Sequence, residues 1–112
     1  MKVGRLQGMR VLFIRPPGRP EVAAFVAERY TERLLGLTGL RGLPPGTGLL
    51  IPGCRAVHTL GMRFRLEIMF VTLERGSVLV HDARHRVSPG RFVRASPSAR
   101  IEPGLAALEL PG

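Results

Sequence analysis

The sequence predicts a small, mostly β domain of the α+β class: an antiparallel β-sheet or barrel-like domain with one prominent helix. Short apolar runs separated by Gly and Pro recur through the second half of the chain, as in β domains. One segment with helix signals precedes them. The 112 residues, 45% of them hydrophobic, are enough for one core, so residues 1–112 are expected to form a single domain.

The first half of the chain alternates between strand-like and irregular segments. Val11–Ile14 is a short expected strand. It ends at the Pro-rich segment Arg15–Pro20, because proline removes backbone donors. Glu21–Tyr30 fits both a helical face and one side of a strand, so its periodicity leaves the structure open.

The expected helix covers Thr31–Leu37. Thr31 is placed to cap the first turn, and Glu32 lies where the helix dipole favours negative charge. Gly36 or Gly39 can end the helix in a left-handed turn. A Gly- and Pro-rich connection follows.

The second half is predicted to be β. The expected strands are Gly48–Ile51, Ala56–Thr59, Leu66–Leu73, Ser77–His81, Arg91–Ala95 and Leu105–Leu110. The turn Glu74–Ser77 contains Gly76, where a positive φ costs little, and predicts an antiparallel hairpin between Leu66–Leu73 and Ser77–His81. The Ser96–Ser98 segment has the composition of a turn.

The net charge of +9 makes anionic partners eligible, nucleic acid among them. The densest basic region contains Arg84, Arg86, Arg91 and Arg94. Elsewhere the charge is spread along the chain, and a GC-rich genome gives a similar Arg-rich composition. Most of the charge is therefore expected to be solvated surface, with a nucleic-acid interface through these four arginines as an alternative.

Cysteine content and hydropathy indicate the cellular compartment of the protein. Cys54 is the only cysteine, so the chain has no internal disulfide. The longest early apolar stretch, Val11–Ile14, is too short for a signal peptide or a membrane span. We expect a cytoplasmic protein without membrane insertion.

Five segments resemble a known family. They are Arg33–Leu37, Gly48–Ile51, the block His-Thr-Leu-Gly-Met-Arg-Phe at His58–Phe64, Leu66–Phe70, and Leu-Glu-Leu-Pro at Leu108–Pro111. In this order they resemble the domain-of-unknown-function 192 family (DUF192, uncharacterised protein family UPF0127), in the branch with the His-Thr-x-Gly-Met-Arg-Phe block. The resemblance covers about residues 22–112. It implies a compact, mostly antiparallel β domain with one helix, and no established activity.

Polar residues in and after the central block form the candidate ligand site. His58, Thr59, Arg63 and Glu67 can converge at the mouth of a small barrel, where Arg63 would hold an anion. The structural alternative is that Glu67 pairs with Arg33 or Arg63 and ties the helix to the sheet. Burying a carboxylate without a partner costs free energy. If Glu67 is buried, it must therefore either contact a ligand or pair with one of these arginines.

Cys54 and His58 are four residues apart and suggest either a thiolate with its base or two metal ligands. A structural zinc site needs about four ligands, which this chain supplies only if His81 and His85 join them. The preferred interpretation is an inert buried thiol and a hydrogen-bonded histidine. We therefore expect no metal, no cofactor and no catalytic residue.

The leading hypothesis is a non-enzymatic binding module for a small ligand or a segment of another protein. Gly-rich phosphate-binding motifs are absent from the sequence. No second carboxylate lies near Glu67 in sequence, so paired acid–base hydrolysis is not suggested. The alternatives are a basic nucleic-acid-binding protein and an enzyme that uses Cys54 and His58.

Overall fold

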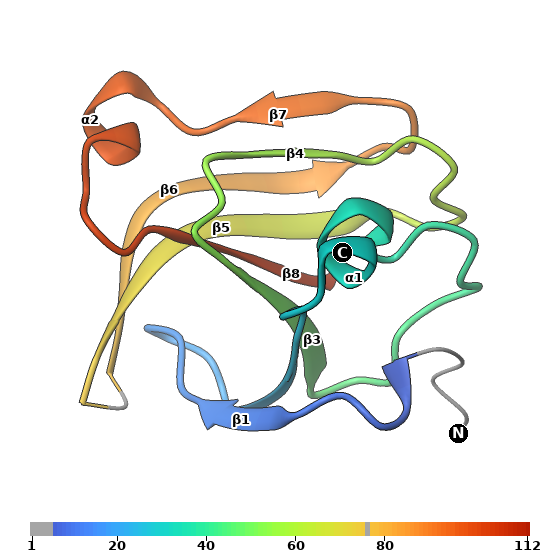
Figure 1. The fold of residues 1–112 in the computed structure, drawn as a ribbon, viewed down its shortest axis with the longest axis horizontal. Coiled ribbons are helices and arrows are strands. Elements are labelled where there is room, and N and C mark those ends of the chain that lie inside the picture. The colour runs from blue at the N-terminus through green and yellow to red at the C-terminus, as the bar shows by residue number, and fades with distance from the viewer. Residues whose placement is uncertain (1–5, 76) are drawn as a thin grey trace.

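The computed structural model describes residues 6–75 and 77–112, which form eight strands and two short helices (Figure 1). The elements are β1 (Val11–Ile14), β2 (Val22–Val26), α1 (Tyr30–Leu35), β3 (Thr47–Pro52), β4 (Ala56–His58), β5 (Leu66–Glu74), β6 (Ser77–Val87), β7 (Phe92–Arg94), α2 (Pro97–Arg100) and β8 (Ala106–Pro111). The mostly β architecture with a helix before the main strands confirms the predicted fold class.

Six strands form one mixed sheet in the order β1-β2-β3-β8-β5-β6. All neighbours in it are antiparallel except β2 and β3, which are parallel and are connected through α1. β4 and β7 pair separately as an antiparallel two-stranded ribbon. The last strand, β8, therefore lies in the middle of the sheet, between β3 and β5.

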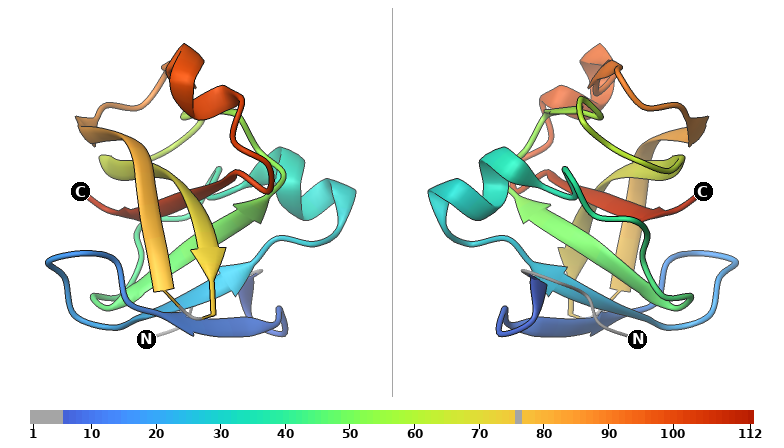
Figure 2. Two further views of the ribbon diagram at one scale, coloured as in Figure 1. Left: turned by 90° about the vertical axis from the view of Figure 1, so that its left-hand side faces the viewer. Right: turned by 90° about the vertical axis from the view of Figure 1, so that its right-hand side faces the viewer.

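The large sheet coils without closing into a barrel. An isolated parallel bridge between Arg15 and Ser77 brings the end of β1 to the start of β6, the two outermost strands. Figure 2 shows the strong twist that carries β5 and β6 across the direction of β1 and β2. Neither helix in the described part of the chain is long and apolar enough to cross a membrane.

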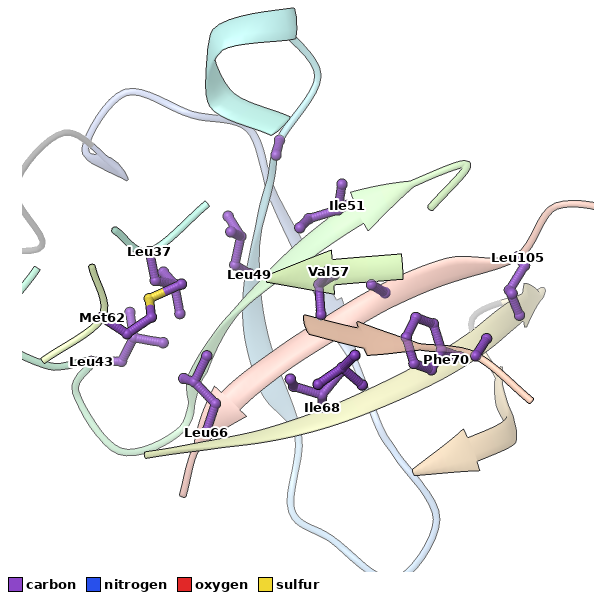
Figure 3. Close-up of a cluster of buried hydrophobic side chains, with 14 of the residues drawn as sticks. Leu37, Leu43, Leu49, Ile51, Val57, Met62, Leu66, Ile68, Phe70 and Leu105 are labelled. Atoms are coloured by element: carbon purple, nitrogen blue, oxygen red, sulfur yellow. The ribbon is translucent and has the colours of Figure 1, made fainter. Parts of the chain in front are cut away.

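Two apolar clusters cover the two faces of the sheet. The sheet core lies inside the coil and joins Ile14 of β1 to Val78 of β6. The ribbon core lies between the sheet and the β4–β7 ribbon and includes Val57, Ile68 and Phe70 (Figure 3). Because side chains alternate along a strand, the central strands contribute to both cores and are buried on both faces.

Helix α1 begins one residue earlier than predicted. Its N-cap residue is Arg29, and Thr31 lies within the first turn, so the expected capping role of Thr31 is wrong. Glu32 satisfies this end instead: its Oε1 accepts hydrogen bonds from the backbone N–H groups of Glu28 (3.1 Å) and Arg29 (2.9 Å). Gly36, with φ +52°, ends the helix as expected.

Local patterns settled most of the strands but not all of the segments between them. The ambiguous Glu21–Tyr30 segment forms β2, because it pairs with β1 on one side and β3 on the other. β6 is longer than the expected Ser77–His81 and runs to Val87. Ser96–Ser98 is not a simple turn, since Pro97 begins the one-turn helix α2. The prediction for Gly76 falls outside the described residues.

Candidate functional site

A cavity of about 190 Å³ opens between the C-terminal end of α1, the loop after β3 and the start of β4. Apolar side chains form most of its wall, and four polar side chains lie among them. The lining residues are Arg33, Leu34, Leu35, Gly36, Ile51, Cys54, Ala56, Val57, His58 and Glu109. The volume is below the roughly 300–1,000 Å³ of common small-molecule sites, so any ligand must be small.

Glu109 is the most unusual residue of this cavity. It lies on β8 opposite Leu49 of β3 and Ile68 of β5, at a position of the ribbon core where its neighbours are apolar. It is only 1% exposed, and its Oε1 has no hydrogen-bond partner in the described part of the chain. A Cβ at Gly36 would lie 3.5 Å from this oxygen, so the helix end passes directly over the carboxyl group.

Burial in this apolar setting raises the pKa of Glu109 from 4.5 to about 8. The cause is desolvation, which disfavours the charged form of a carboxyl group. At neutral pH the side chain is therefore mainly a neutral carboxylic acid. It places one O–H donor and one carbonyl acceptor at the cavity.

The other three polar side chains of the cavity already donate to backbone carbonyls. His58 Nε2 lies 3.3 Å from the oxygen of Leu34, and His58 Nδ1 accepts from the N–H of Leu60 at 3.2 Å. Because a carbonyl only accepts and an N–H only donates, the ring is held as the tautomer protonated on Nε2. Arg33 Nη2 donates to the oxygen of Gly53 at 3.4 Å.

Cys54 also has a backbone partner. Its Sγ donates to the carbonyl oxygen of Ala56 at 3.0 Å. Burial raises the pKa of this thiol, and the hydrogen bond and the Arg33 guanidinium offset the rise only in part. Since the thiolate is the reactive form, this environment favours an inert thiol. Cys54 and His58 thus share the cavity, but each is bonded to backbone.

Metal binding finds no support in the arrangement of ligands. Within residues 6–75 and 77–112, no three His, Cys, Asp or Glu side chains gather in a way that could hold an ion. His81 belongs to a different polar cluster, in which its Nε2 lies 2.8 Å from Thr72 Oγ1 and its Nδ1 lies 3.9 Å from Glu102 Oε1. This cluster links β5, β6 and the segment before β8, and none of its residues lines the cavity of Glu109.

Of the four residues predicted to converge, only His58 lines the cavity. Thr59 is fully buried and holds the β4–β7 ribbon together. Its hydroxyl donates to the oxygen of Ser88 and accepts from the N–H of Arg91, both at 2.8 Å. Arg63 is exposed in the loop that follows.

Glu67 points to the opposite side of the sheet from Glu109. Its neighbours Leu66 and Ile68 face the ribbon core, so its own side chain faces away. The carboxylate lies 2.5 Å from His85 Nδ1 and 3.7 Å from Arg19 Nη2. It is therefore paired, as the structural alternative required, but with Arg19 and His85 in place of the expected Arg33 or Arg63.

The four arginines of the nucleic-acid alternative lie on β6, on β7 and in the turn between them. Arg84 is engaged with Asp82, and its Nη2 also reaches the oxygen of Arg94 at 3.5 Å. Arg86, Arg91 and Arg94 are exposed. Phe92 beside them is 79% exposed, with its ring centroid 6.4 Å from that of His58.

Sequence reasoning missed Glu109 as a site residue. Leu105–Leu110 was expected to be a strand, and Leu108–Pro111 was noted only for its family resemblance. The available signal was a single carboxylate inside an otherwise apolar run. In a strand buried on both faces, such a residue has no solvent-facing side to occupy.

Two solved structures share this fold. A protein of unknown function from Novosphingobium aromaticivorans superposes with a TM-score of 0.73 at 22% identity, covering 99% of this chain and 80% of that one. A "putative transcription regulator" from Sinorhizobium meliloti gives 0.67 at 19% identity, covering 91% and 78%. At these identities the likeness extends to the fold alone.

Comparison by sequence gives the family. No curated protein matches the chain. The profile of DUF192, described as "Uncharacterized ACR, COG1430", matches residues 13–112. That range includes every strand from β2 to β8, both helices, and the cavity with Glu109. The chain therefore belongs to the DUF192 family.

Proposed function

We propose that the protein is a non-enzymatic binding module whose ligand occupies the cavity between α1 and β4, in contact with Glu109 and His58. The ligand is a small molecule or a single side chain from a segment of another protein. A cytoplasmic location, expected from the single cysteine and the sequence patterns, is part of the same proposal.

The unpartnered carboxyl group of Glu109 is the observation that carries this proposal. Leaving a buried polar group without a hydrogen bond costs about 1–3 kcal/mol. That is a large part of a net stability of about 5–15 kcal/mol. Nearly all buried polar groups in proteins have a hydrogen-bond partner, so an unsatisfied one calls for a specific explanation. Because Glu109 lines a cavity, a ligand there can supply the missing partner.

The lining supports binding more than catalysis. The Cys54 thiol is half-buried and bonded to a carbonyl, and both ring nitrogens of His58 are engaged with backbone. Neither side chain is arranged to take a proton from the other. What the cavity offers is a small apolar wall with one unsatisfied polar group, which is the usual composition of a recognition site.

A matched pair of variants tests whether the cavity is the binding site. Leu34 lines the cavity and is 55% exposed, whereas Leu79 on β6 is 48% exposed and does not line it. We would screen small amines, amides, alcohols and carboxylates by NMR chemical shifts against the wild type, Leu34→Trp and Leu79→Trp. We expect at least one class to shift resonances around the cavity in the wild type and Leu79→Trp, and not in Leu34→Trp.

Two results of this screen would count against the proposal. One is that no class of probe shifts the cavity resonances of the wild type at millimolar concentration. The other is that Leu34→Trp binds the same probes as tightly as Leu79→Trp, which would place binding elsewhere. Melting temperatures of both variants, measured in parallel, confirm that each is folded.

Nucleic-acid binding is a second candidate, favoured by the exposed Phe92 between Arg91 and Arg94. An exposed aromatic ring flanked by arginines suits base stacking and phosphate contact. The expected signature is binding to single-stranded oligonucleotides that weakens steeply as salt rises and is lost in Phe92→Ala. Absence of binding at low salt would remove this candidate and leave the cavity proposal intact.

A further inference from the structure

We infer that the ligand of the cavity carries a cationic nitrogen, as in a primary amine or an amidine, on a small apolar body, and that this nitrogen is held by the carboxyl group of Glu109. The inference rests on the proposed binding function and adds the chemical class of the ligand. It follows from which polar groups in the cavity are engaged and which are not.

Each donor side chain of the cavity already has a backbone acceptor, although Arg33 keeps further N–H groups. His58 Nε2, Cys54 Sγ and Arg33 Nη2 each donate to a backbone carbonyl. Among the four polar side chains that line the described cavity, Glu109 alone has a buried atom without a partner. A matching ligand must therefore satisfy a carboxyl group, which favours a ligand rich in N–H donors.

The surrounding groups also favour donors on the ligand. The oxygen of Leu34 accepts from His58 Nε2 next to the cavity, and a carbonyl oxygen has a second lone pair. An ammonium group has three N–H donors, which the two carboxyl oxygens and this carbonyl can accept. Leu34, Leu35, Ile51 and Val57 provide an apolar wall for the rest of a short alkyl chain.

A carboxylate ligand fits these contacts less well. It would receive one hydrogen bond from the neutral Glu109, the donors of His58 and Cys54 are engaged, and the remaining N–H groups of the exposed Arg33 are its only further side-chain donors in the described lining. If Glu109 ionised, the two carboxylates would repel each other. A neutral alcohol can bond to Glu109 but lacks the Coulombic attraction, which is strongest in a poorly solvated site.

Binding of a cation must be linked to release of a proton from Glu109. The charged and titratable groups facing this carboxyl are Arg33 from α1, Cys54 from the loop before β4, and His58 from β4. The adjacent strands contribute Leu49 and Ile68, which are apolar. Arg33 is exposed and its charge is screened by solvent, so the carboxylate formed on binding can pair with the ligand.

The test uses three probes of nearly the same size and shape: n-butylamine, n-butanol and butyrate. Affinity is measured by NMR titration from pH 6 to pH 9 on the wild type, Leu34→Trp and Glu109→Gln. For the amine we expect affinity to rise about tenfold per pH unit up to about pH 8 and then to level off. Glu109→Gln should lose at least tenfold in amine affinity at pH 8 and keep its affinity for butanol.

The outcomes separate this inference from the proposed function. If butyrate or butanol binds the cavity and butylamine does not, the amine inference is wrong while the binding function stands. If none of the three binds the wild type, or all bind Leu34→Trp equally, the proposed function fails as well. An amine affinity that stays constant from pH 6 to pH 8 in the wild type would also overturn the inference, even if Glu109→Gln failed to fold.

Discussion

Glu67 and Glu109 lie on neighbouring strands of one sheet but on opposite faces, and their surroundings differ completely. Glu67, near the start of β5, has 13% of its side chain exposed and is paired with His85 and Arg19. Glu109, in the middle strand, is buried in the ribbon core with an unpartnered oxygen. The first carboxylate fits a structural role. The second is a buried polar group without a partner among the described residues, which is why we propose that it belongs to the ligand site.

The largest expected difference between Glu109 and Glu67 is in how each affects the pH dependence of stability. From the ordinary pKa of 4.5 up to about 8, the unfolded chain releases the Glu109 proton while the folded protein keeps it. The free energy of unfolding should then fall by about 1.4 kcal/mol per pH unit, or up to about 5 kcal/mol across the window. Glu109→Gln should remove this loss, as measured by urea unfolding at pH 5, 6.5 and 8.

The control for this experiment is Glu67→Gln, which changes the paired carboxylate and leaves Glu109 in place. It should retain the wild-type loss of stability between pH 5 and pH 8. If Glu109→Gln and Glu67→Gln show the same pH profile, then the two carboxyl groups do not differ in the way their surroundings indicate.

Thr59 sharpens the comparison, because it is buried near the same core as Glu109 but is fully hydrogen-bonded. Its hydroxyl bonds to Ser88 and Arg91 hold the turn between β6 and β7 to β4. Thr59→Val should lower the free energy of unfolding by about 2–3 kcal/mol, since two part-buried backbone groups lose their partner and the Thr59 side chain itself is fully buried. Thr59→Ser keeps the hydroxyl and should cost clearly less in the same unfolding assay. Equal losses for Val and Ser would show that packing of the methyl group matters more.

Glu67→Ala should have a smaller effect, about 1–2 kcal/mol. The carboxylate is largely buried, but its partner His85 has 67% of its side chain exposed, so solvent weakens the pair. Chemical denaturation of Glu67→Ala and His85→Ala, together with the double variant, measures the coupling directly. A loss of unfolding free energy as large as that of Thr59→Val would mean that Glu67 contributes more to stability than its exposure indicates.

Arg19→Ala should have the smallest effect, below about 0.5 kcal/mol. Its guanidinium lies 3.7 Å from Glu67 and is partly exposed, so the attraction is modest and screened by salt. Arg10→Ala is the matched control, because the Arg10–Glu28 pair is a more exposed ion pair in another region. In thermal melts at 0.05 M and 0.5 M salt, the melting temperatures of both variants should lie close to that of the wild type. A loss above 1 kcal/mol that persisted at high salt would contradict this interpretation.

Local sequence patterns were enough to locate most of the strands and helix α1. Val11–Ile14 is a strand with the expected bounds, and Gly36 ends α1, because proline and glycine act on the backbone wherever they stand. Glu21–Tyr30 could not be assigned from its own residues. Its structure depends on pairing with β1 and β3, which is a property of the whole sheet.

The site was harder to predict than the fold, because it depends on which strand takes the centre of the sheet. His58, selected from the central block, lines the cavity, and its role in binding stays a prediction. Glu67 was selected and Glu109 was missed, because both are acidic residues in strands and the sequence does not show which strand is buried on both faces. The position of β8 between β3 and β5 is what buries Glu109 and leaves its Oε1 without a hydrogen-bond partner among the described residues.

The central position of β8 also has a consequence for biosynthesis. Until residues 106–111 leave the ribosome, β1-β2-β3 and β5-β6 remain two separate units, each with an unpaired edge where β8 will later insert. Such edges and the uncovered apolar faces beside them favour association with other chains. The domain can therefore complete its sheet only after residues 106–111 have emerged. The strand that joins the two units also brings Glu109 to the cavity, so the proposed ligand site forms together with the completed sheet.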